Sequence, residues 1–163
     1  MFNKCYIILL LILPLTVKCQ IKNPLYKLMI DSFILSSPII TIDSFKNLKN
    51  TFVLDTREST EYEVSHIKNA RNVGYIWFDM RNVYDIPKTA NIVVYCTIGF
   101  RSQKICQKLT SLGYQHVYNL YGSIFEWVNR GYPVYKSNGI QTSEIHTYDE
   151  SWAKWVSKGT IVY

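Results

Sequence analysis

The sequence predicts an α/β fold, an open five-stranded parallel sheet with helices on both faces. Short segments rich in β-branched and aromatic residues alternate with amphipathic segments between residues 38 and 135. This order is typical of parallel strands joined by helices. The segment IVVYC at residues 92–96 is apolar throughout, as in strands buried on both faces. With 163 residues, 48% of them apolar, the chain is long enough for one domain with a substantial core.

The strands and helices of this region can be placed from the same patterns. Strands are expected at residues 39–42, 51–55, 70–73, 92–96 and 117–120, and helical segments at residues 44–48, 58–64, 101–112 and 123–130. Acidic residues near the start of segment 58–64 suit the positive end of a helix dipole. Gly113 and Gly131 are expected to end the last two helices.

The first 19 residues have the features of a secretory signal peptide. Lys4 precedes an apolar stretch at residues 6–13, which is broken by Pro14 and is too short to span a bilayer. Cleavage after Cys19 predicts an exported protein, periplasmic or secreted, without an integral membrane span. The alternative is a lipoprotein anchored at Cys19, but Lys18 stands where the lipid-attachment signal requires a small residue.

Two segments lie outside the predicted α/β region. Residues 20–37 are of mixed polarity and are expected to form a linker or a loosely packed N-terminal arm. Residues 136–163 form a C-terminal extension with a short aromatic helix, for which Asp149 or Ser151 would suit the start. Its large side chains are Tyr148, Trp152, Trp155 and Val156. They are expected to dock on the domain as a lid or strap, and the alternative is that they form a partner-binding surface.

Cys96 is the candidate nucleophile. It ends the most apolar predicted strand, and Arg101 and Ser102 open a helix only a few residues later. The carboxyl ends of parallel strands are where open α/β sheets bind ligands. Loop N–H groups, the helix dipole and a nearby guanidinium all favour a thiolate. The alternative is that Cys96 is a small core residue, because free cysteine is often buried.

Four segments resemble the motifs of rhodanese-like domains, the single-domain sulfurtransferases. CTIGFRS at residues 96–102 matches the active-site loop pattern C-x-x-G-x-R-S. VLDTREST at residues 53–60 resembles the family's D-x-R-E motif, and EYEVSHIKNARNV at residues 61–73 and the stretch at residues 109–134 match further motifs in order. The resemblance covers roughly residues 38–135. Departures from the family glycines occur at Ser65, Asn69 and Ser123.

This resemblance implies a rhodanese-like fold and a sulfur-transfer reaction. Cys96 would take a sulfane sulfur from thiosulfate or a persulfide, hold it as a persulfide and pass it to a thiol or to cyanide. The residues implied to bind the persulfide are Thr97, Ile98, Gly99, Phe100, Arg101 and Ser102. Asp55 and Arg57 are implied to support the site without transferring protons. A non-catalytic rhodanese-fold module for binding or redox sensing is the alternative function.

The length and composition of the loop favour sulfur chemistry. Four residues separate Cys96 from Arg101, one fewer than in the phosphate-binding loops of cysteine-dependent phosphatases. A shorter ring of amides suits one terminal sulfur better than a phosphate. Thr97, Ile98 and Phe100 are uncharged, which favours a persulfide on a larger thiol or on a partner protein over free thiosulfate.

Other residue types indicate which partners are not expected. Cys106 lies on the apolar side of a predicted helix and is expected to be a buried thiol, the alternative being a resolving cysteine for Cys96.

His66, His116 and His146 lack metal-ligand spacing, so neither a metal nor another cofactor is expected. The net charge of +6 comes without a basic run, so nucleic-acid binding is not expected. The expected partners are a small sulfur donor and a thiol acceptor, either free or on a protein.

Overall fold

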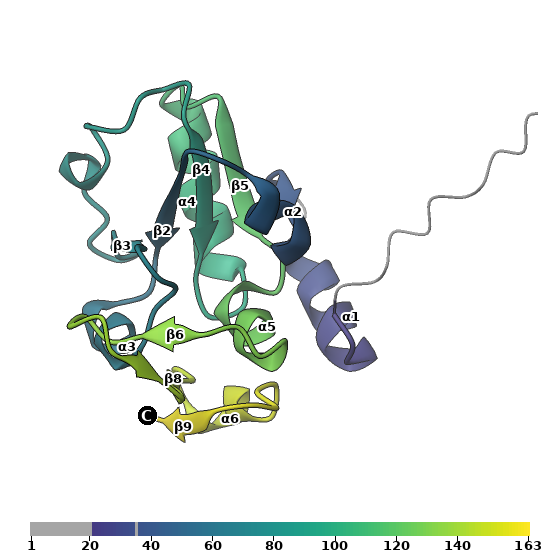
Figure 1. The fold of residues 1–163 in the computed structure, drawn as a ribbon. Helices are drawn as coiled ribbons and strands as arrows, with labels where there is room; N and C mark the ends of the chain where they lie inside the picture. Colours follow the sequence, from purple (N-terminus) through teal and green to yellow (C-terminus); the bar gives the residue numbers. More distant parts are fainter. Residues whose placement is uncertain (1–20, 35) are drawn as a thin grey trace, which may run out of the picture.

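A computed structural model describes residues 21–34 and 36–163 of the chain. The predicted signal peptide and the cysteine of the lipoprotein alternative lie outside these residues. The described part is built around a five-stranded parallel sheet with the order β1-β5-β4-β2-β3 (Figure 1). The sheet and the helices beside it confirm the predicted α/β fold.

The central strand of the sheet is the apolar segment singled out from the sequence. The strands are β1 (Ile39–Ile40), β2 (Thr51–Asp55), β3 (Arg71–Asn72), β4 (Asn91–Tyr95) and β5 (His116–Leu120). Strand β4 pairs with β2 on one side and β5 on the other. Its last four residues, from Ile92 to Tyr95, are fully buried. Because all five strands are parallel, their carboxyl ends meet at one edge of the sheet.

Helices cover both faces of this sheet. The helices of the domain are α2 (Ile42–Asn47), α3 (Ser59–Val64), the 3-10 turn η1 (Met80–Asn82), α4 (Phe100–Ser111) and α5 (Ser123–Asn129). Val93 and Tyr95 of β4 pack in the core that contains Trp127 of α5. Ile92 and Val94 pack in a second core with Cys106 of α4. Alternate residues of one strand therefore face two separate helical layers.

The first strand is shorter than the expected segment 39–42. It ends at Ile40, and helix α2 begins at Ile42. The Thr41 side chain accepts a hydrogen bond from the backbone N–H of Ser44 at 3.1 Å, which is a typical N-cap contact. This cap starts the helix two residues before the expected position.

The expectation of a linker or loosely packed arm at residues 20–37 is wrong. Helix α1 (Pro24–Phe33) occupies most of this segment, and the Asn23 side chain caps it by accepting from the N–H groups of Leu25 and Tyr26. Tyr26 and Ile30 are one helical turn apart and are buried, at 1% and 0% exposure. An N-cap followed by proline and an apolar i, i+4 pair is a helix-start signal, which the mixed polarity of the segment obscured.

The C-terminal extension packs against the domain. It contains β7 (Gln141–Thr142), β8 (Glu144–His146), α6 (Glu150–Ala153) and β9 (Thr160–Val162), and β6 (Val134–Tyr135) lies just before it. β6 pairs with β7 and β8 pairs with β9, below the main sheet in Figure 1. Ile145 is fully buried, and the rings of Trp155 and Tyr26 lie 5.6 Å apart. Asp149 caps α6, as expected.

Two functional expectations can be compared with this fold. In residues 21–34 and 36–163, no helix combines the length and apolar character needed to cross a bilayer. Both cysteines in these residues are free thiols, and Cys106 is fully buried on α4. The structure thus places Cys106 as a core thiol rather than in a disulfide.

Candidate active site

The loop between β4 and α4 places backbone and side-chain donors around the Cys96 sulfur. The N–H of Gly99 donates a hydrogen bond to Cys96 Sγ at 3.1 Å, and the Ser102 hydroxyl lies 3.6 Å from the same sulfur. Gly99 is the N-cap of α4 and has a φ of +112°. A Cβ at this position would lie 2.7 Å from Ile34 Cδ1. The turn that aims the N–H at the sulfur therefore requires glycine.

Buried polar side chains hold this loop in place. Ser102 Oγ donates to Asn119 Oδ1 at 2.8 Å, and Asn119 Nδ2 donates to the Gly99 carbonyl at 3.0 Å. The N–H of Cys96 donates to Ser123 Oγ at 3.2 Å. These bonds tie the loop to β5 and to the start of α5, so the donors around the sulfur are fixed before a substrate binds.

The three departures from the family glycines have different structural consequences. Ser123 adopts a φ of +50° and Asn69 a φ of +62°, a left-handed region that asparagine tolerates well. Ser123 also supplies the hydroxyl that receives the Cys96 N–H. Ser65 has a φ of −169°, which is extended backbone that any residue adopts.

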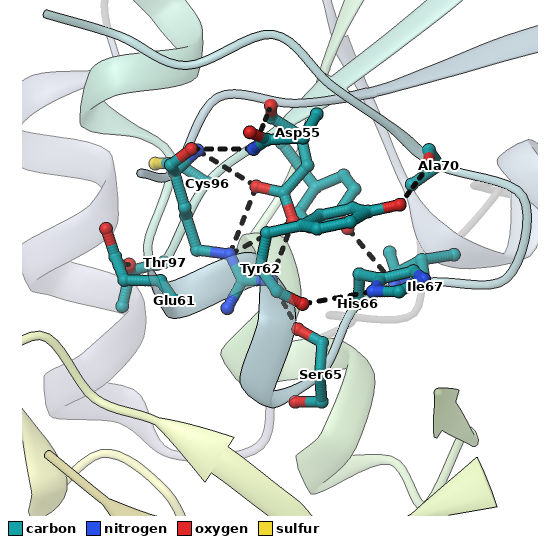
Figure 2. A network of polar contacts seen from close by, with 12 residues as sticks. Asp55, Glu61, Tyr62, Ser65, His66, Ile67, Ala70, Cys96 and Thr97 are labelled. Atoms are coloured by element: carbon teal, nitrogen blue, oxygen red, sulfur yellow. Dashed lines mark hydrogen bonds and ion pairs between the residues drawn. The ribbon is translucent and has the colours of Figure 1, made fainter. Parts of the chain in front are cut away.

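Arg101 is held by the carboxylate of Glu61, a residue that the sequence analysis did not identify as part of the site. Its guanidinium donates to both carboxylate oxygens of Glu61, at 2.6 and 2.7 Å, and to Thr97 Oγ1 at 2.7 Å. Glu61 lies on α3, beside Thr97 in Figure 2, and only 2% of its surface is exposed. Burial opposes ionisation of Glu61, but hydrogen bonds from Arg101 and its charge hold the pKa of Glu61 below its usual value.

A sequence signal for Glu61 was present in the EYEV segment. Glu61 stands three residues after Glu58, and its side chain accepts the Glu58 N–H at 3.1 Å. Such spacing is typical of a capping box at a helix start. The pattern identifies the local role of Glu61 but does not identify Arg101, 40 residues later, as its partner.

The same donors and Arg101 change the ionisation of Cys96. Burial raises the pKa of a thiol, and Cys96 is 1% exposed. The positive charge of Arg101 and hydrogen bonds from Ser102 and Gly99 outweigh this burial, so the pKa of Cys96 lies below that of an ordinary cysteine. The loop therefore favours the thiolate, the nucleophilic form of cysteine.

Asp55 and Arg57 lie behind the loop at the end of β2. Their fully buried side chains form an ion pair, with Arg57 Nη2 2.6 Å from Asp55 Oδ2. The same nitrogen donates to the Ser65 carbonyl at 2.6 Å, in the network shown in Figure 2. These contacts connect the sheet to the end of α3, the helix that carries Glu61. The pair thus positions α3 and makes its hydrogen bonds away from the Cys96 sulfur.

Cys96 lies in a cavity of about 490 Å³. The cavity extends from the loop to residues of the N-terminal helix, the β3–β4 connection and the C-terminal extension. Its described lining residues are Phe33, Glu58, Tyr75, Ile76, Cys96, Thr97, Ile98, Phe100, Arg101, Tyr148 and Trp152. Cys96 is among these lining residues although only 1% of its surface is exposed, so protein atoms cover most of the side chain. Among these lining residues, Arg101 is the only basic one.

The histidines were examined as possible metal ligands. In the described residues, no group of three or more histidine, cysteine, aspartate or glutamate side chains is arranged to hold a metal. His66 stacks on Tyr62 with ring centroids 3.8 Å apart, and its Nδ1 is 3.0 Å from the Tyr62 carbonyl. His146 lies near the site on β8, where burial lowers its pKa.

These features define a class of protein: α/β domains with a cysteine-centred anion site between the central parallel strand and the following helix. The chain belongs to the rhodanese-like domain family, whose sequence model matches residues 41–130. This membership supports a function of the sulfurtransferase type. Helix α1 and the C-terminal extension lie outside the matched residues.

The chain is also similar to curated and solved proteins. A tRNA uridine(34) hydroxylase from Buchnera aphidicola subsp. Acyrthosiphon pisum is 34% identical over 130 residues, covering 75% of this chain and 39% of the relative. The chain thus spans less than half of that relative's length. A rhodanese-related protein from Thermoplasma volcanium is 29% identical, with a TM-score of 0.52, over 60% of this chain and 96% of its own.

A third comparison bears on the fold alone. Thiosulfate sulfurtransferase from Pseudomonas aeruginosa superposes with a TM-score of 0.57 at 19% identity, over 71% of this chain and 22% of its own. At this identity the likeness concerns the arrangement of strands and helices.

Proposed function

We propose that the chain is a sulfurtransferase in which Cys96 carries the transferred sulfur as a persulfide. The observation that carries this proposal is the Cys96 sulfur itself, which accepts a hydrogen bond from the Gly99 N–H at 3.1 Å in a residue that lines a cavity. A persulfide extends the side chain by one sulfur into that cavity. The donors that favour a thiolate also suit the anionic persulfide, since both place negative charge on sulfur.

The reaction has two displacement steps. In the first, the Cys96 thiolate attacks the outer sulfur of a donor, a new S–S bond forms, and the donor's own S–S bond breaks. The donor leaves as a thiolate, or as sulfite when it is thiosulfate. In the second step, an acceptor thiolate or cyanide attacks the outer sulfur, and Cys96 leaves again as a thiolate. The two steps return the enzyme to its starting state and need no external oxidant or reductant.

The favoured donor is a persulfide on an organic thiol rather than thiosulfate. Thiosulfate carries two negative charges, and Arg101, the basic residue among the lining residues, already pairs with both oxygens of Glu61. Glu58 adds a carboxylate to the cavity lining, while Phe33, Ile76 and Trp152 add apolar walls. This lining suits an organic group more than a small dianion.

Mass spectrometry of the chain, with peptide mapping to separate Cys96 from Cys5, Cys19 and Cys106, tests the proposal. After treatment with glutathione persulfide, Cys96 should gain the mass of one sulfur atom, and cyanide should remove it. The adduct should be absent in Cys96→Ser and present in Cys106→Ser, which keeps the loop intact. A Cys96 that gains no sulfur from either glutathione persulfide or thiosulfate would contradict the proposal and favour a binding module.

Action on tRNA is a second candidate, favoured by the 34% identity to a tRNA uridine(34) hydroxylase over 130 residues. That name describes a protein of which this chain spans 39%. Gel-shift measurements with unfractionated tRNA at physiological salt test the candidate. Binding that survives this salt would support a role on tRNA, while binding only at low salt would reflect the net charge of +6.

A further inference from the structure

Two segments outside the family match complete the cavity around Cys96. Phe33 comes from α1, and Tyr148 and Trp152 come from the C-terminal extension. Phe33 packs edge-on against Phe100, with ring centroids 5.9 Å apart. These residues add aromatic walls to a pocket that begins at a loop on the edge of the sheet.

The two segments also contact each other. The rings of Tyr26 on α1 and Trp155 of the extension lie 5.6 Å apart. The Asn129 side chain of α5 donates to the Trp155 carbonyl at 2.8 Å. The extension is thus anchored away from the cavity mouth, which leaves Tyr148 and Trp152 in defined positions above the loop.

Tyr148 adopts an uncommon backbone conformation at this mouth. Its φ is +72°, a left-handed value that is rare for a bulky residue and that clusters at functional sites. Its N–H donates to His146 Nδ1 at 3.0 Å, which holds the turn. The side chain is nevertheless 60% exposed, so core packing does not explain why a tyrosine occupies this position.

The Tyr148 ring covers the charged group of the site. The guanidinium carbon of Arg101 lies 5.4 Å from the ring centroid, within the range of a cation–π contact. The edges of the same guanidinium donate to Glu61 and Thr97. Arg101 therefore acts on Cys96 through its charge, while both of its terminal nitrogens bond to Glu61 or Thr97 and one face of its guanidinium lies against Tyr148.

We propose that Tyr148 is a specificity-determining residue, whose ring covers Arg101 and disfavours small dianionic donors in favour of persulfides on organic thiols. This inference rests on the proposed function and assigns its donor preference to a residue outside the family match. Removing the ring opens the face of the guanidinium to an anion. Removing a distant exposed tyrosine leaves that face unchanged.

A set of three variants separates the ring from the backbone. Tyr148→Asn removes the ring but keeps a residue that tolerates a positive φ. Tyr148→Phe keeps the ring, and Tyr84→Asn removes a tyrosine that is 78% exposed and does not line the cavity. Thermal unfolding of each variant confirms that it folds before its chemistry is compared.

Alkylation of Cys96 provides a readout that does not require sulfur transfer. The ratio of rates with iodoacetate, an anion, and iodoacetamide, which is neutral, reports how readily an anion reaches the sulfur. Tyr148→Asn should raise this ratio about two- to fivefold, the strength of an exposed cation–π contact. Tyr148→Phe and Tyr84→Asn should leave it unchanged.

Turnover then tests the donor preference itself. The ratio of kcat/KM for thiosulfate to that for glutathione persulfide should rise in Tyr148→Asn alone. An unchanged alkylation ratio in Tyr148→Asn, or an equal rise in Tyr84→Asn, would overturn the role of Tyr148. Loss of sulfur transfer with every donor would instead contradict the proposed function, while the alkylation ratio would still test Tyr148.

Discussion

The loop before α4 and the sheet-facing side of the same helix each hold a buried cysteine. The pKa of Cys96 is lowered, whereas the pKa of Cys106 is raised. Cys96 and Cys106 are 1% and 0% exposed. Burial and the negative charge of Cys96 hold the pKa of Cys106 far above its usual value. At Cys96, burial is outweighed by Arg101 and by hydrogen bonds from Ser102 and Gly99. Burial alone therefore gives an inert thiol, and aimed donors are what distinguish the loop.

The largest expected effect comes from disturbing the donor at Gly99. In Gly99→Ala, the left-handed backbone would cost about 1–3 kcal/mol, and the new Cβ would lie 2.7 Å from Ile34 Cδ1. Both stability in urea and alkylation of Cys96 should fall. Gly113→Ala is the matched control, because Gly113 has a φ of +89° with no atom within 4 Å of the added Cβ. Equal losses in both variants would show that the loop has no special requirement.

Replacing Cys106 tests the other region. In Cys106→Ser, a hydroxyl placed among Ile105, Leu109 and other apolar residues of the core should lower the unfolding free energy by about 1–3 kcal/mol. The alkylation rate of Cys96 should remain that of the wild type. Cys96→Ser should cost less stability, because the loop supplies polar partners. A slower sulfur transfer in Cys106→Ser, at unchanged Cys96 reactivity, would indicate a resolving role for Cys106.

Arg101→Gln removes the charge beside Cys96 but also leaves the buried carboxylate of Glu61 without its ion-pair partner, so thermal unfolding is used first to check that the variant folds. In Arg101→Gln, the pKa of Cys96 should rise, so the reaction with iodoacetamide at pH 7 should slow on the order of tenfold. Arg81→Gln is the control, since Arg81 is an exposed arginine whose ion pair is with Asp79. A Cys96 rate that is the same in both variants would assign the activation to the backbone donors alone.

Glu126 extends the comparison to a carboxylate. Burial raises its pKa to about 7, although Arg130 and Lys22 lower it. The folded chain then binds more protons than the unfolded chain between pH 4.5 and about 7, so stability should fall as pH rises through this window. Glu126→Gln should remove this fall and gain on the order of 1 kcal/mol at pH 8. Thermal unfolding at pH 5 and pH 8 measures it; parallel changes in both proteins would contradict the burial effect.

Residues close together in the chain carried most of what could be predicted. The site of Cys96 is built from one contiguous stretch: strand 92–96, the loop to Ser102 and the following helix. Their apolar pattern and spacing therefore predicted donors around the Cys96 sulfur. Glu61 was missed as the partner of Arg101, since their contact joins two elements 40 residues apart. Phe33 and Tyr148 reach the cavity only through the packing of α1 and the extension. The spacing of aromatic residues predicted that Tyr148 docks on the domain, but no pattern in the sequence encodes its contact with Arg101 or the position of Phe33.

The pH dependence of Cys96 alkylation by iodoacetamide tests the central claim most directly. A thiolate stabilised by the Gly99 N–H, Ser102 and Arg101 should reach half of its maximal rate at a pH below that of free cysteine, about 8.5. The profile is best measured in Cys106→Ser, with peptide mapping to separate Cys96 from Cys5 and Cys19 and with unfolded protein as the reference. A half-maximal pH at or above that of the unfolded chain would contradict an activated Cys96.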